Sequence, residues 1–285
     1  MLNLIWVRTF LALVERKSFQ GAADLLALAQ PTVSLHIQKL EEQLGAVLFH
    51  RSRTGCEPTR AAMNFLPYAQ SIIRVNERAM ASVAGDRLRV GASSNIGIYL
   101  LPPYVRSYLD DRSQSEVDIV IDRNPTVAQK LETGEIDIAV MEWWDNREGC
   151  DARVWKSEPV VVIVPPGHPL AAQTVMERDQ LSDLELLGGE PGTGTGRLLA
   201  GYFGDATRMP RVSRQLGSTE AVKQAVKAGL GISLVLASSV ADAVKAGSLV
   251  AIPLAGSGLD KELFVAWKQT GAGGQVKAFL EHLSA

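Results

Sequence analysis

Two short amphipathic helices that nearly touch in the sequence constrain the fold of this chain more than any other feature. The segment FQGAADLLALAQPTVSLHIQKLEEQLG starts with one helical pattern, breaks for about three or four residues, and continues with a second pattern that ends at Gly45. Ser18 stands where an N-cap is expected before the first pattern. The small side chains of Ala22 and Ala23 let the two helices approach closely. The segment therefore predicts a helix-turn-helix.

Polar residues remain on the outside at the head of the second helix, because Val33 and Ile37 belong to its apolar face. Such side chains can bond to base edges and phosphates, and the first turn of a recognition helix enters the major groove. An ordinary three-helix bundle with a polar solvent face is the alternative, since a further helical pattern runs from Leu4 to Val14. Periodicity alone leaves both interpretations open. The outward candidates are Gln30, Thr32, Ser34, His36 and Lys39.

A short β-hairpin is predicted directly after the second helix. In AVLFHRSRTGCEPT, Arg51 and Arg53 precede a turn at Gly55, and Pro58 follows. A wing of this kind would bring its two arginines to phosphate or to the minor groove. A solvated hairpin that carries two arginines by chance is the alternative.

The run from Phe10 to Ile73 resembles the winged helix-turn-helix of LysR-type transcriptional regulators. The resemblance rests on SFQGAADLLALAQPTVSLHIQKLEEQLGAVLFHRS and on FLPYAQSII. It implies that the head of the recognition helix faces the DNA and that the wing supports it. On this resemblance, the residues at the DNA are Gln30, Pro31, Thr32 and Ser34, with Arg51 and Arg53 on the wing.

Three positions depart from the family pattern. Ala29 stands where the family usually has Ser or Thr, so the recognition helix lacks a side-chain cap worth about 1 kcal/mol. Leu35 replaces a common arginine and offers an apolar contact to a thymine methyl group. Ala62 replaces a usual glycine after the wing. Because of these changes, the operator sequence of the family does not carry over to this chain, but we still expect it to bind DNA.

A long helix is predicted after the wing, in TRAAMNFLPYAQSIIRVNERAMASVAG. Its apolar residues are spaced alternately four and three apart, with Asn76 as a polar position that could fix register. We expect a dimerisation helix, which is also how the family uses this segment; a helix packed on its own domain is the alternative. Pro67 should kink or loosen the first turns. The predicted seam is Ala62, Leu66, Ala69, Ile73, Asn76, Met80 and Val83.

From Leu88 onward, strand and helix patterns alternate in two successive sets. Alternation predicts an α/β fold with mostly parallel sheets, and two sets suggest two lobes around a cleft. This part resembles the family's effector domain, which is built like a periplasmic binding protein. The fold class is therefore α/β overall: a winged helix-turn-helix DNA-binding domain at 1–59, a dimerisation linker helix at 60–86, and a two-lobed effector-binding domain at 87–285. The first lobe covers about 87–160 and 268–285, and the second about 161–267.

A ligand in such a fold is expected beyond the carboxyl ends of the strands, where helix N-termini favour an anion. Four strand-to-helix turns qualify, two in each lobe. By resemblance, the first two are the usual effector contacts and the others face them. Each hydroxyl or amide could instead be an ordinary N-cap. The candidates are Ser93, Ser94, Asn95, Asn124, Thr126, Thr193, Thr195, Ser218 and Thr219.

Two further features are expected near this cleft. Glu142, Trp143 and Trp144 follow the third strand directly and could wall the cleft, although an aromatic pair is more often core packing. Gly196 stands where relatives that contain REPGSGTR have an arginine. That glycine would enlarge the pocket or remove a carboxylate clamp.

The distribution of charge fits a DNA-binding first module. Residues 1–84 hold nine basic and six acidic side chains, whereas the remainder holds 20 basic and 25 acidic ones. The two cysteines, Cys56 and Cys150, fit a reducing cytosol, and a redox role for either stays open. We expect a cytoplasmic protein without a membrane partner, because the first residues lack signal-peptide features and no apolar run is long enough to span a bilayer.

No catalytic residue, metal site or cofactor is expected. GEPGTGTGR lacks the Lys-Ser/Thr pair of a nucleotide loop, and the four histidines are scattered. A cytosolic enzyme that uses the cleft for a small carboxylate substrate is the alternative, but no nucleophile–base pair supports it. The predicted function is a LysR-type regulator controlled by a small, anionic metabolite. The predicted partners are double-stranded DNA with a pseudo-palindromic operator, the effector and a second copy of the chain; the resemblance adds a tetramer and RNA polymerase.

Overall fold

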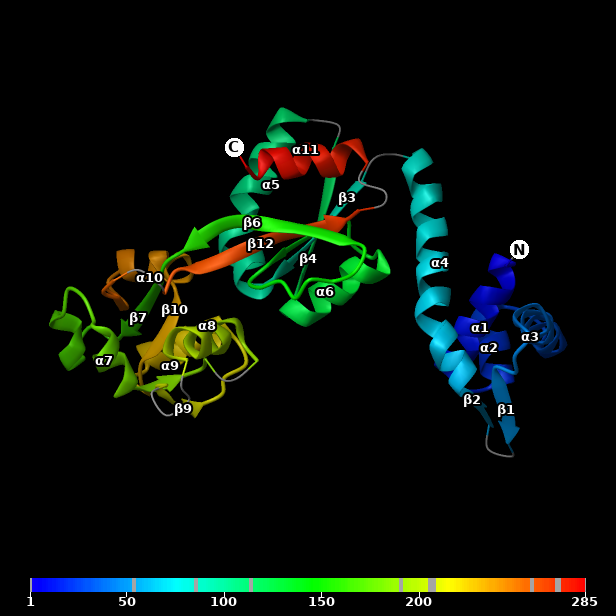
Figure 1. The fold of residues 1–285 in the computed structure, drawn as a ribbon, viewed down its shortest axis with the longest axis horizontal. Coiled ribbons are helices and arrows are strands. Elements are labelled where there is room, and N and C mark those ends of the chain that lie inside the picture. The colour runs from blue at the N-terminus through cyan, green and yellow to red at the C-terminus, as the bar shows by residue number, and fades with distance from the viewer. Residues whose placement is uncertain are drawn as a thin grey trace. The chain divides into compact units, whose positions relative to one another are not determined.

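The protein is described by a computed structural model covering residues 2–52, 55–84, 87–112, 115–189, 192–204, 209–256, 259–269 and 273–284 (Figure 1). The chain forms two compact units. One contains Met1–Arg87 with Thr133–Glu135, and the other contains Leu88–Glu132 with Ile136–Ala285. Among the helices in the described ranges, none is long and apolar enough to cross a membrane.

Three helices open the first unit: α1 (Leu4–Arg16), α2 (Phe19–Leu26) and α3 (Gln30–Leu44). The Ser18 hydroxyl accepts a hydrogen bond from the Gly21 amide, which confirms the predicted N-cap of α2. Gly45 ends α3 in the left-handed region at φ 66°, as predicted. The turn between α2 and α3 is three residues long, so this part of the chain is a helix-turn-helix.

The three helices share one apolar core. Val7 and Phe10 of α1 meet Val33 and Ile37 of α3, all at 3% exposure or less. Ala22 and Ala23 of α2 are fully buried in the same core, which confirms that their small side chains allow close helix packing. The apolar face predicted for α3 is therefore the face that it buries.

The predicted wing is present as the antiparallel strands β1 (Phe49–Ser52) and β2 (Gly55–Pro58). The Glu41 carboxylate of α3 accepts hydrogen bonds from the Leu48 amide at 2.6 Å and the Phe49 amide at 3.3 Å. The Cys56 amide donates to the Lys17 carbonyl at 3.1 Å. These bonds tie the wing to α3 and α1. Of its two candidate arginines, Arg53 and the side chain of Arg51 lie outside the described residues.

The linker helix α4 runs from Arg60 to Ala84 as one helix, with Pro67 inside it. The first half of the predicted seam does not face outward: Ala62, Ala69 and Ile73 are buried in the core of the winged unit. The seam prediction is wrong there, because the helix first has to cover the open side of α1 and the wing. Met80 is exposed, and the side chain of Val83 lies outside the described residues.

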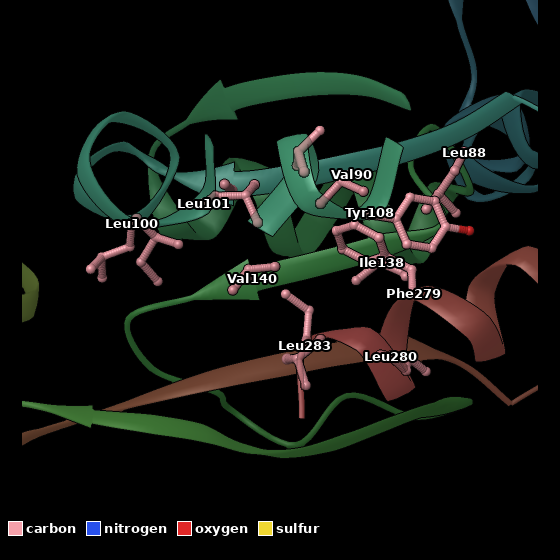
Figure 2. Close-up of a cluster of buried hydrophobic side chains, with 14 of the residues drawn as sticks. Leu88, Val90, Leu100, Leu101, Tyr108, Ile138, Val140, Phe279, Leu280 and Leu283 are labelled. Atoms are coloured by element: carbon pink, nitrogen blue, oxygen red, sulfur yellow. The ribbon is translucent and has the colours of Figure 1, made fainter. Parts of the chain in front are cut away.

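The second unit contains a five-stranded sheet in the order β4-β3-β5-β12-β6. Successive side chains of its strands point to opposite faces of the sheet. Ile138 and Val140 pack with Tyr108 and Phe279 on one face (Figure 2). Ala139 packs with α6 on the other face. The strands are β3 (Arg87–Ser93), β4 (Glu116–Asp122), β5 (Ile138–Met141), β6 (Cys150–Glu158) and β12 (Lys261–Lys268). The helices are η1 (Ile96–Leu100), α5 (Leu101–Asp111), α6 (Asn124–Thr133) and α11 (Gly274–His282).

The rest of this unit surrounds a three-stranded sheet in the order β10-β7-β11 and a parallel pair of strands, β8 and β9. Its strands are β7 (Val160–Val164), β8 (Glu185–Leu187), β9 (Arg211–Arg214), β10 (Ser233–Leu236) and β11 (Val250–Pro253). Its helices are η2 (Pro169–Ala172), α7 (Arg178–Ser182), α8 (Gly194–Phe203), α9 (Thr219–Lys227), η4 (Ala237–Ser239) and α10 (Ala241–Lys245).

The α/β class is as predicted, but the sheets are less parallel than expected. β12 is antiparallel to both of its neighbours, and β7 is antiparallel to β10 and β11. The chain leaves the first sheet through β6, enters the second through β7, and returns through β12, so the crossing strands run in opposite directions. Residues 261–267, which the sequence places in the second lobe, therefore lie in the sheet of the first.

The uncapped start of α3 gives a direct test of this local structure. The N-cap is Ala29, which makes no side-chain hydrogen bond, as the sequence predicts. We expect Ala29→Ser to stabilise the winged unit by about 1 kcal/mol, because the new hydroxyl can accept from the Thr32 amide. Thermal unfolding would measure the gain, and hydrogen exchange would locate it in the first turn of α3. Ala200→Ser on the exposed side of α8 is the control, where serine should not stabilise; an equal gain there would contradict the prediction.

Candidate functional site: a recognition helix and the residues that join two lobes

The first turns of α3 present the candidate DNA-contacting surface. Leu35 is half-exposed and Pro31 is exposed, while Gln30 donates from its side-chain amide to the Ser34 hydroxyl at 3.2 Å. These residues are held outward because α3 buries Val33 and Ile37. A groove of about 410 Å³ lies along this face and is lined by Pro31, Ser34, Leu35 and Gln38 together with Phe19 and Phe49. Thr32 is half-buried in the same turn.

Two of the predicted DNA contacts also have partners within the winged unit. The Thr9 hydroxyl donates to the Ile5 carbonyl, so it accepts its second hydrogen bond from Nδ1 of His36 at 2.9 Å. His36 thus ties α3 to α1 and keeps only Nε2 for another contact. The Lys39 ammonium donates to Glu42 at 2.9 Å, and this hydrogen bond lowers the pKa of the Glu42 carboxyl.

In the first lobe, the predicted effector turns carry side chains with different local roles. The Ser93 hydroxyl, at 2% exposure, has no hydrogen-bond partner among the described residues. Ser94 donates to the Asp122 carbonyl at 3.3 Å, and the Asn95 amide donates to Oε1 of Glu142 at 3.0 Å. A buried hydroxyl without a partner costs free energy, so Ser93 marks a place where a bound group would be favoured.

Asn124 fixes the backbone that follows β5. Its Oδ1 accepts from the Glu142 amide at 2.8 Å, and its Nδ2 donates to the Trp143 carbonyl at 3.1 Å. Both ends of the side chain are therefore used within the protein, which gives this residue a positioning role. Thr126 lies half-buried in the first turn of α6.

In the second lobe, the N-cap interpretation holds for two candidates. The Thr193 hydroxyl accepts from the Gly196 amide at 3.0 Å, and the Ser218 hydroxyl accepts from the Ala221 amide at 3.2 Å. Each hydroxyl caps its helix, α8 or α9. Thr195 and Thr219 are half-buried in the first turns of these helices.

A buried ion pair between Glu142 and Lys261 occupies the middle of this arrangement. Their side chains are 10% and 5% exposed. The pair lies against the start of α8, because a Cβ added at Gly194 would overlap both the carboxylate and the ammonium. Lys261 is not among the site residues predicted from the sequence. The pattern that could have revealed it is the alternation of side chains between the two faces of a strand. Lys261 falls on the same face of β12 as the buried Leu263 and Val265.

The two tryptophans after β5 behave differently. Arg197 of α8 stacks over the ring of Trp143, with its guanidinium carbon 4.7 Å from the ring centroid. Trp143 is thus part of the contact between the lobes. Trp144 packs against the apolar cluster under α6, so the core interpretation holds for it. Gly196 is buried in the first turn of α8.

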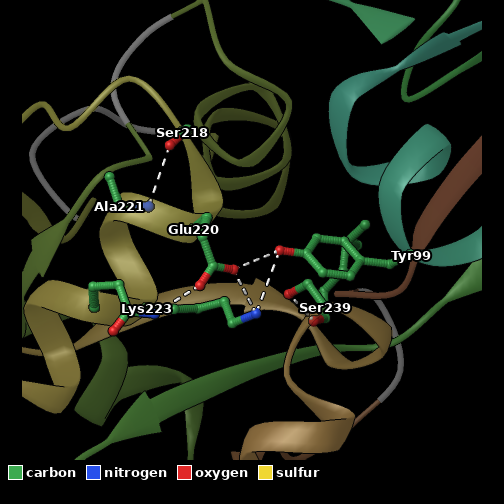
Figure 3. A network of polar contacts seen from close by, with 8 residues as sticks. Tyr99, Ser218, Glu220, Ala221, Lys223 and Ser239 are labelled. Carbon is green, nitrogen blue, oxygen red and sulfur yellow. Dashed lines mark hydrogen bonds and ion pairs between the residues drawn. The ribbon is translucent and has the colours of Figure 1, made fainter.

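A second polar group joins the lobes through Tyr99 of η1 and Glu220 and Lys223 of α9 (Figure 3). The Tyr99 hydroxyl donates to Glu220 at 3.0 Å, and Lys223 donates to Glu220 at 2.8 Å and to Tyr99 at 3.3 Å. The hydrogen bond from Lys223 is the main reason that the pKa of Glu220 falls to about 2. Desolvation raises the pKa of Tyr99. No sequence pattern predicts this cluster, because Tyr99 lies more than 100 residues before Glu220 and Lys223.

The cysteines lie outside both candidate sites. Cys56 is buried in the core of the winged unit, and Cys150 begins β6. Burial raises the pKa of the Cys150 thiol, which lowers its thiolate fraction. Among the described residues, no group of three or more His, Cys, Asp or Glu side chains could hold a metal ion.

Comparison with known proteins matches both units to domains of one family. The model of the bacterial regulatory helix-turn-helix protein, lysR family, matches residues 4–63, and the LysR substrate binding domain matches residues 81–285. This chain belongs to the LysR family of transcriptional regulators. The helix-turn-helix interpretation of α2 and α3 is confirmed over the three-helix alternative, and the chain is a DNA-binding regulator.

Relatives of this LysR-family chain are regulators as well. It is 52% identical over 196 residues to the putative HTH-type transcriptional regulator protein PtxE of Stutzerimonas stutzeri, covering 68% of this chain and all of that protein. It is 31% identical to the HTH-type transcriptional regulator CbbR of Sinorhizobium medicae, covering 84% of this chain and 78% of that protein.

Solved structures share the fold of the LysR-family chain along its whole length. Full-length CbnR in complex with its target DNA superposes with a TM-score of 0.73 at 23% identity, covering 100% of both chains. A full-length OxyR variant from Pseudomonas aeruginosa gives a TM-score of 0.73 at 22% identity, covering 99% of this chain and 95% of that one.

The Tyr99–Glu220–Lys223 cluster predicts a pH-dependent contribution to stability. Because the pKa of Glu220 is about 2 in the folded protein and near 4.5 without its partners, its stabilisation is complete above about pH 4.5 and is lost as the pH falls towards 2. Glu220→Gln should therefore melt below the wild type at pH 6 and converge with it towards pH 2. The difference should be about 1 kcal/mol or less, since half of the Glu220 side chain is exposed. Glu281→Gln on α11 is the control, and a gap that stays constant with pH would contradict the assignment.

Proposed function

We propose that this LysR-family regulator binds its operator through the head of α3 and the wing, and that a small anionic effector controls it from the cleft between the lobes. The observation that carries the proposal is the buried Lys261 ammonium at the N-terminus of α8, together with the buried, unpartnered hydroxyl of Ser93 at the end of β3. All three favour negative charge or accept a hydrogen-bonding group.

At the DNA, the polar head of α3 contacts base edges. Gln30, Thr32 and Ser34 bond to bases or phosphates, and Leu35 contacts a thymine methyl group. At 50% exposure, the Leu35 side chain is accessible for this contact. Pro31 packs against the sugar–phosphate backbone. The remaining contacts proposed from the sequence are those of His36 through Nε2, of Lys39, and of Arg51 and Arg53 to phosphate.

Base contacts and phosphate contacts differ in a measurable way. Gln30→Ala should weaken binding to the cognate operator by about 1–3 kcal/mol and leave non-specific binding nearly unchanged, because it removes a base contact. Lys39→Ala should weaken both by a similar factor and reduce the salt dependence, because it removes a phosphate contact. Fluorescence anisotropy with operator and scrambled duplexes, over a series of salt concentrations, would measure both. The same loss on both duplexes for Gln30→Ala would contradict its role.

A homodimer through α4 is supported by a stripe other than the predicted seam. Tyr68, Ile72, Val75 and Ala79 recur three and four residues apart, beside the face that α4 buries on its own unit. Tyr68 is 69% exposed and Val75 is 56% exposed. A partner helix that covers this outer stripe would leave the winged core intact. Two recognition helices then suit a pseudo-palindromic operator.

The outer stripe predicts which substitutions separate the subunits. Val75→Glu should convert the dimer to monomer, because it places two charges in an apolar contact. Sedimentation velocity would detect the change, and circular dichroism would verify that the helices remain. Met63→Glu, at another exposed apolar residue of α4 that lies on a different face of the helix, is the matched control and should leave the assembly unchanged. A Val75→Glu protein that sediments as the wild type would exclude the outer stripe.

Control by an effector requires that the ligand bind one arrangement of the lobes more tightly than another. The links between the lobes, Arg197 with Trp143 and Tyr99 with Glu220, are the contacts that opening of the cleft would break. We infer that the effector changes how firmly the lobes close and thereby how paired subunits present their wings. Assembly into tetramers and contact with RNA polymerase belong to this proposal through the family, as does a cytoplasmic location beside the DNA.

The enzyme alternative has less support. Around the cleft, the described residues supply an ion pair, hydroxyls that cap helices and an amide that fixes the backbone. None of these contacts forms a nucleophile–base pair of the kind that hydrolases and transferases use. The relatives named above are regulators. We therefore propose binding without catalysis.

Thermal unfolding against a panel of small carboxylates, aromatic acids, inorganic oxyanions and amino acids tests the effector proposal. A ligand at about a hundred times its dissociation constant should stabilise the protein by about 2.7 kcal/mol. Ser93→Ala should weaken that shift, whereas Ser107→Ala on the exposed side of α5 should not. If no anion in the panel stabilises the protein while it still binds specific DNA, the anion site is rejected and the assignment as a regulator stands.

A further inference from the structure

Glu142 is surrounded by the groups that an anionic ligand would need. Lys261 forms an ion pair with Oε2, and the Asn95 amide donates to Oε1 at 3.0 Å. Both charged side chains are at least nine-tenths buried. Burying charges costs several kcal/mol for each ion unless the partners and hydrogen bonds are in place. The carboxylate is therefore held as a bound anion is held.

The N-terminus of α8 adds a further favourable group at this point. α8 has ten residues, and its start at Gly194 has no room for a side chain because the carboxylate and the ammonium fill that space. Negative charge is stabilised at a helix N-terminus. The buried, unpartnered Ser93 hydroxyl lies at the same edge of the sheet, since Ala92 of β3 pairs with Val140 of β5, two residues before Glu142.

The backbone that carries Glu142 is fixed by contacts separate from those that hold its carboxylate. Asn124 bonds to the Glu142 amide and to the Trp143 carbonyl, so residues 142 and 143 stay in place. The carboxylate can still leave by rotation about its side-chain bonds, which needs no backbone movement. Its departure would leave the Lys261 ammonium, the Asn95 amide and the start of α8 facing an empty space.

We propose that the Glu142 carboxylate is a tethered occupant of the effector pocket, and that an anionic effector binds Lys261, Asn95 and the N-terminus of α8 by displacing it. This inference rests on the proposed function and specifies how its site is regulated. With Glu142 in place, the ammonium and the carboxylate neutralise each other. An incoming anion therefore has to compete with a carboxylate that is always present, which weakens its apparent affinity.

The test compares the full-length wild type with Glu142→Gln, which keeps the volume of the side chain but not its charge. The double variant Glu142→Gln/Lys261→Met removes both charges. The control is Glu262→Gln, which removes an exposed carboxylate from β12, the strand that carries Lys261. The probes are potassium acetate, phosphate and sulfate, with potassium chloride at matched ionic strength as the reference. Thermal unfolding and calorimetric titration measure stability and affinity.

We expect Glu142→Gln to melt below the wild type in chloride, to recover with at least one of the three anions, and to bind it at least tenfold more tightly than the wild type does. The double variant and Glu262→Gln should not gain affinity. Equal affinity in wild type and Glu142→Gln would overturn the tethered occupant and leave the anionic effector site standing. No anion response in any protein would overturn both.

A measurement on the wild type keeps the test decisive if Glu142→Gln does not fold. In nitrogen-15 spectra of the full chain, saturating acetate, phosphate or sulfate should shift the Gly194 amide and the Asn95 side-chain amide, because a new anion replaces Glu142 beside them. Stabilisation by one of these anions without either shift would overturn the displacement.

Discussion

The buried pair of Glu142 and Lys261 is the interaction on which the two-lobed unit depends most. It joins the end of β5 to the start of β12, the strand that returns the chain to the first sheet, and it lies against α8 of the second lobe. Neither charge is stable alone at this depth, so each requires the other or a substitute. This requirement places a buried pair of opposite charges where the two lobes meet.

In the winged unit, the burial of apolar side chains determines which side chains of α3 face the DNA. α3 places Val33, Ile37 and Leu40 in the core, and the residues between them point outward because the helix has 3.6 residues per turn. The Glu41 carboxylate, which accepts from the Leu48 and Phe49 amides, and the hydrogen bond between His36 and Thr9 then set the orientation of α3. The polar head of the helix is thus positioned by contacts on its opposite side and at its far end.

Where sequence prediction failed, the cause was a contact between segments distant in the chain. The spacing of Ala62, Ala69 and Ile73 fits a dimer seam and an intramolecular face equally well, since both need an apolar stripe. Only the position of α1 decides that these residues are covered within the unit. Thr193 and Ser218 are a local case: their hydroxyls cap their own helices, and an additional contact to an effector stays a prediction.

The sequence by itself determined the order of domains, the helix-turn-helix, the caps at Ser18 and Gly45, the missing cap at Ala29, and the α/β class of the second unit. These features depend on short-range periodicity and on residues within one turn of each other. The tertiary structure alone decided the antiparallel course of β12, the partner of Lys261, and the cluster of Tyr99, Glu220 and Lys223. Glu142 and Lys261 are more than 100 residues apart, as are Tyr99 and Glu220, and the direction of β12 is set by how the chain crosses between the lobes. No local pattern encodes such a meeting, because it depends on the packing of whole sheets.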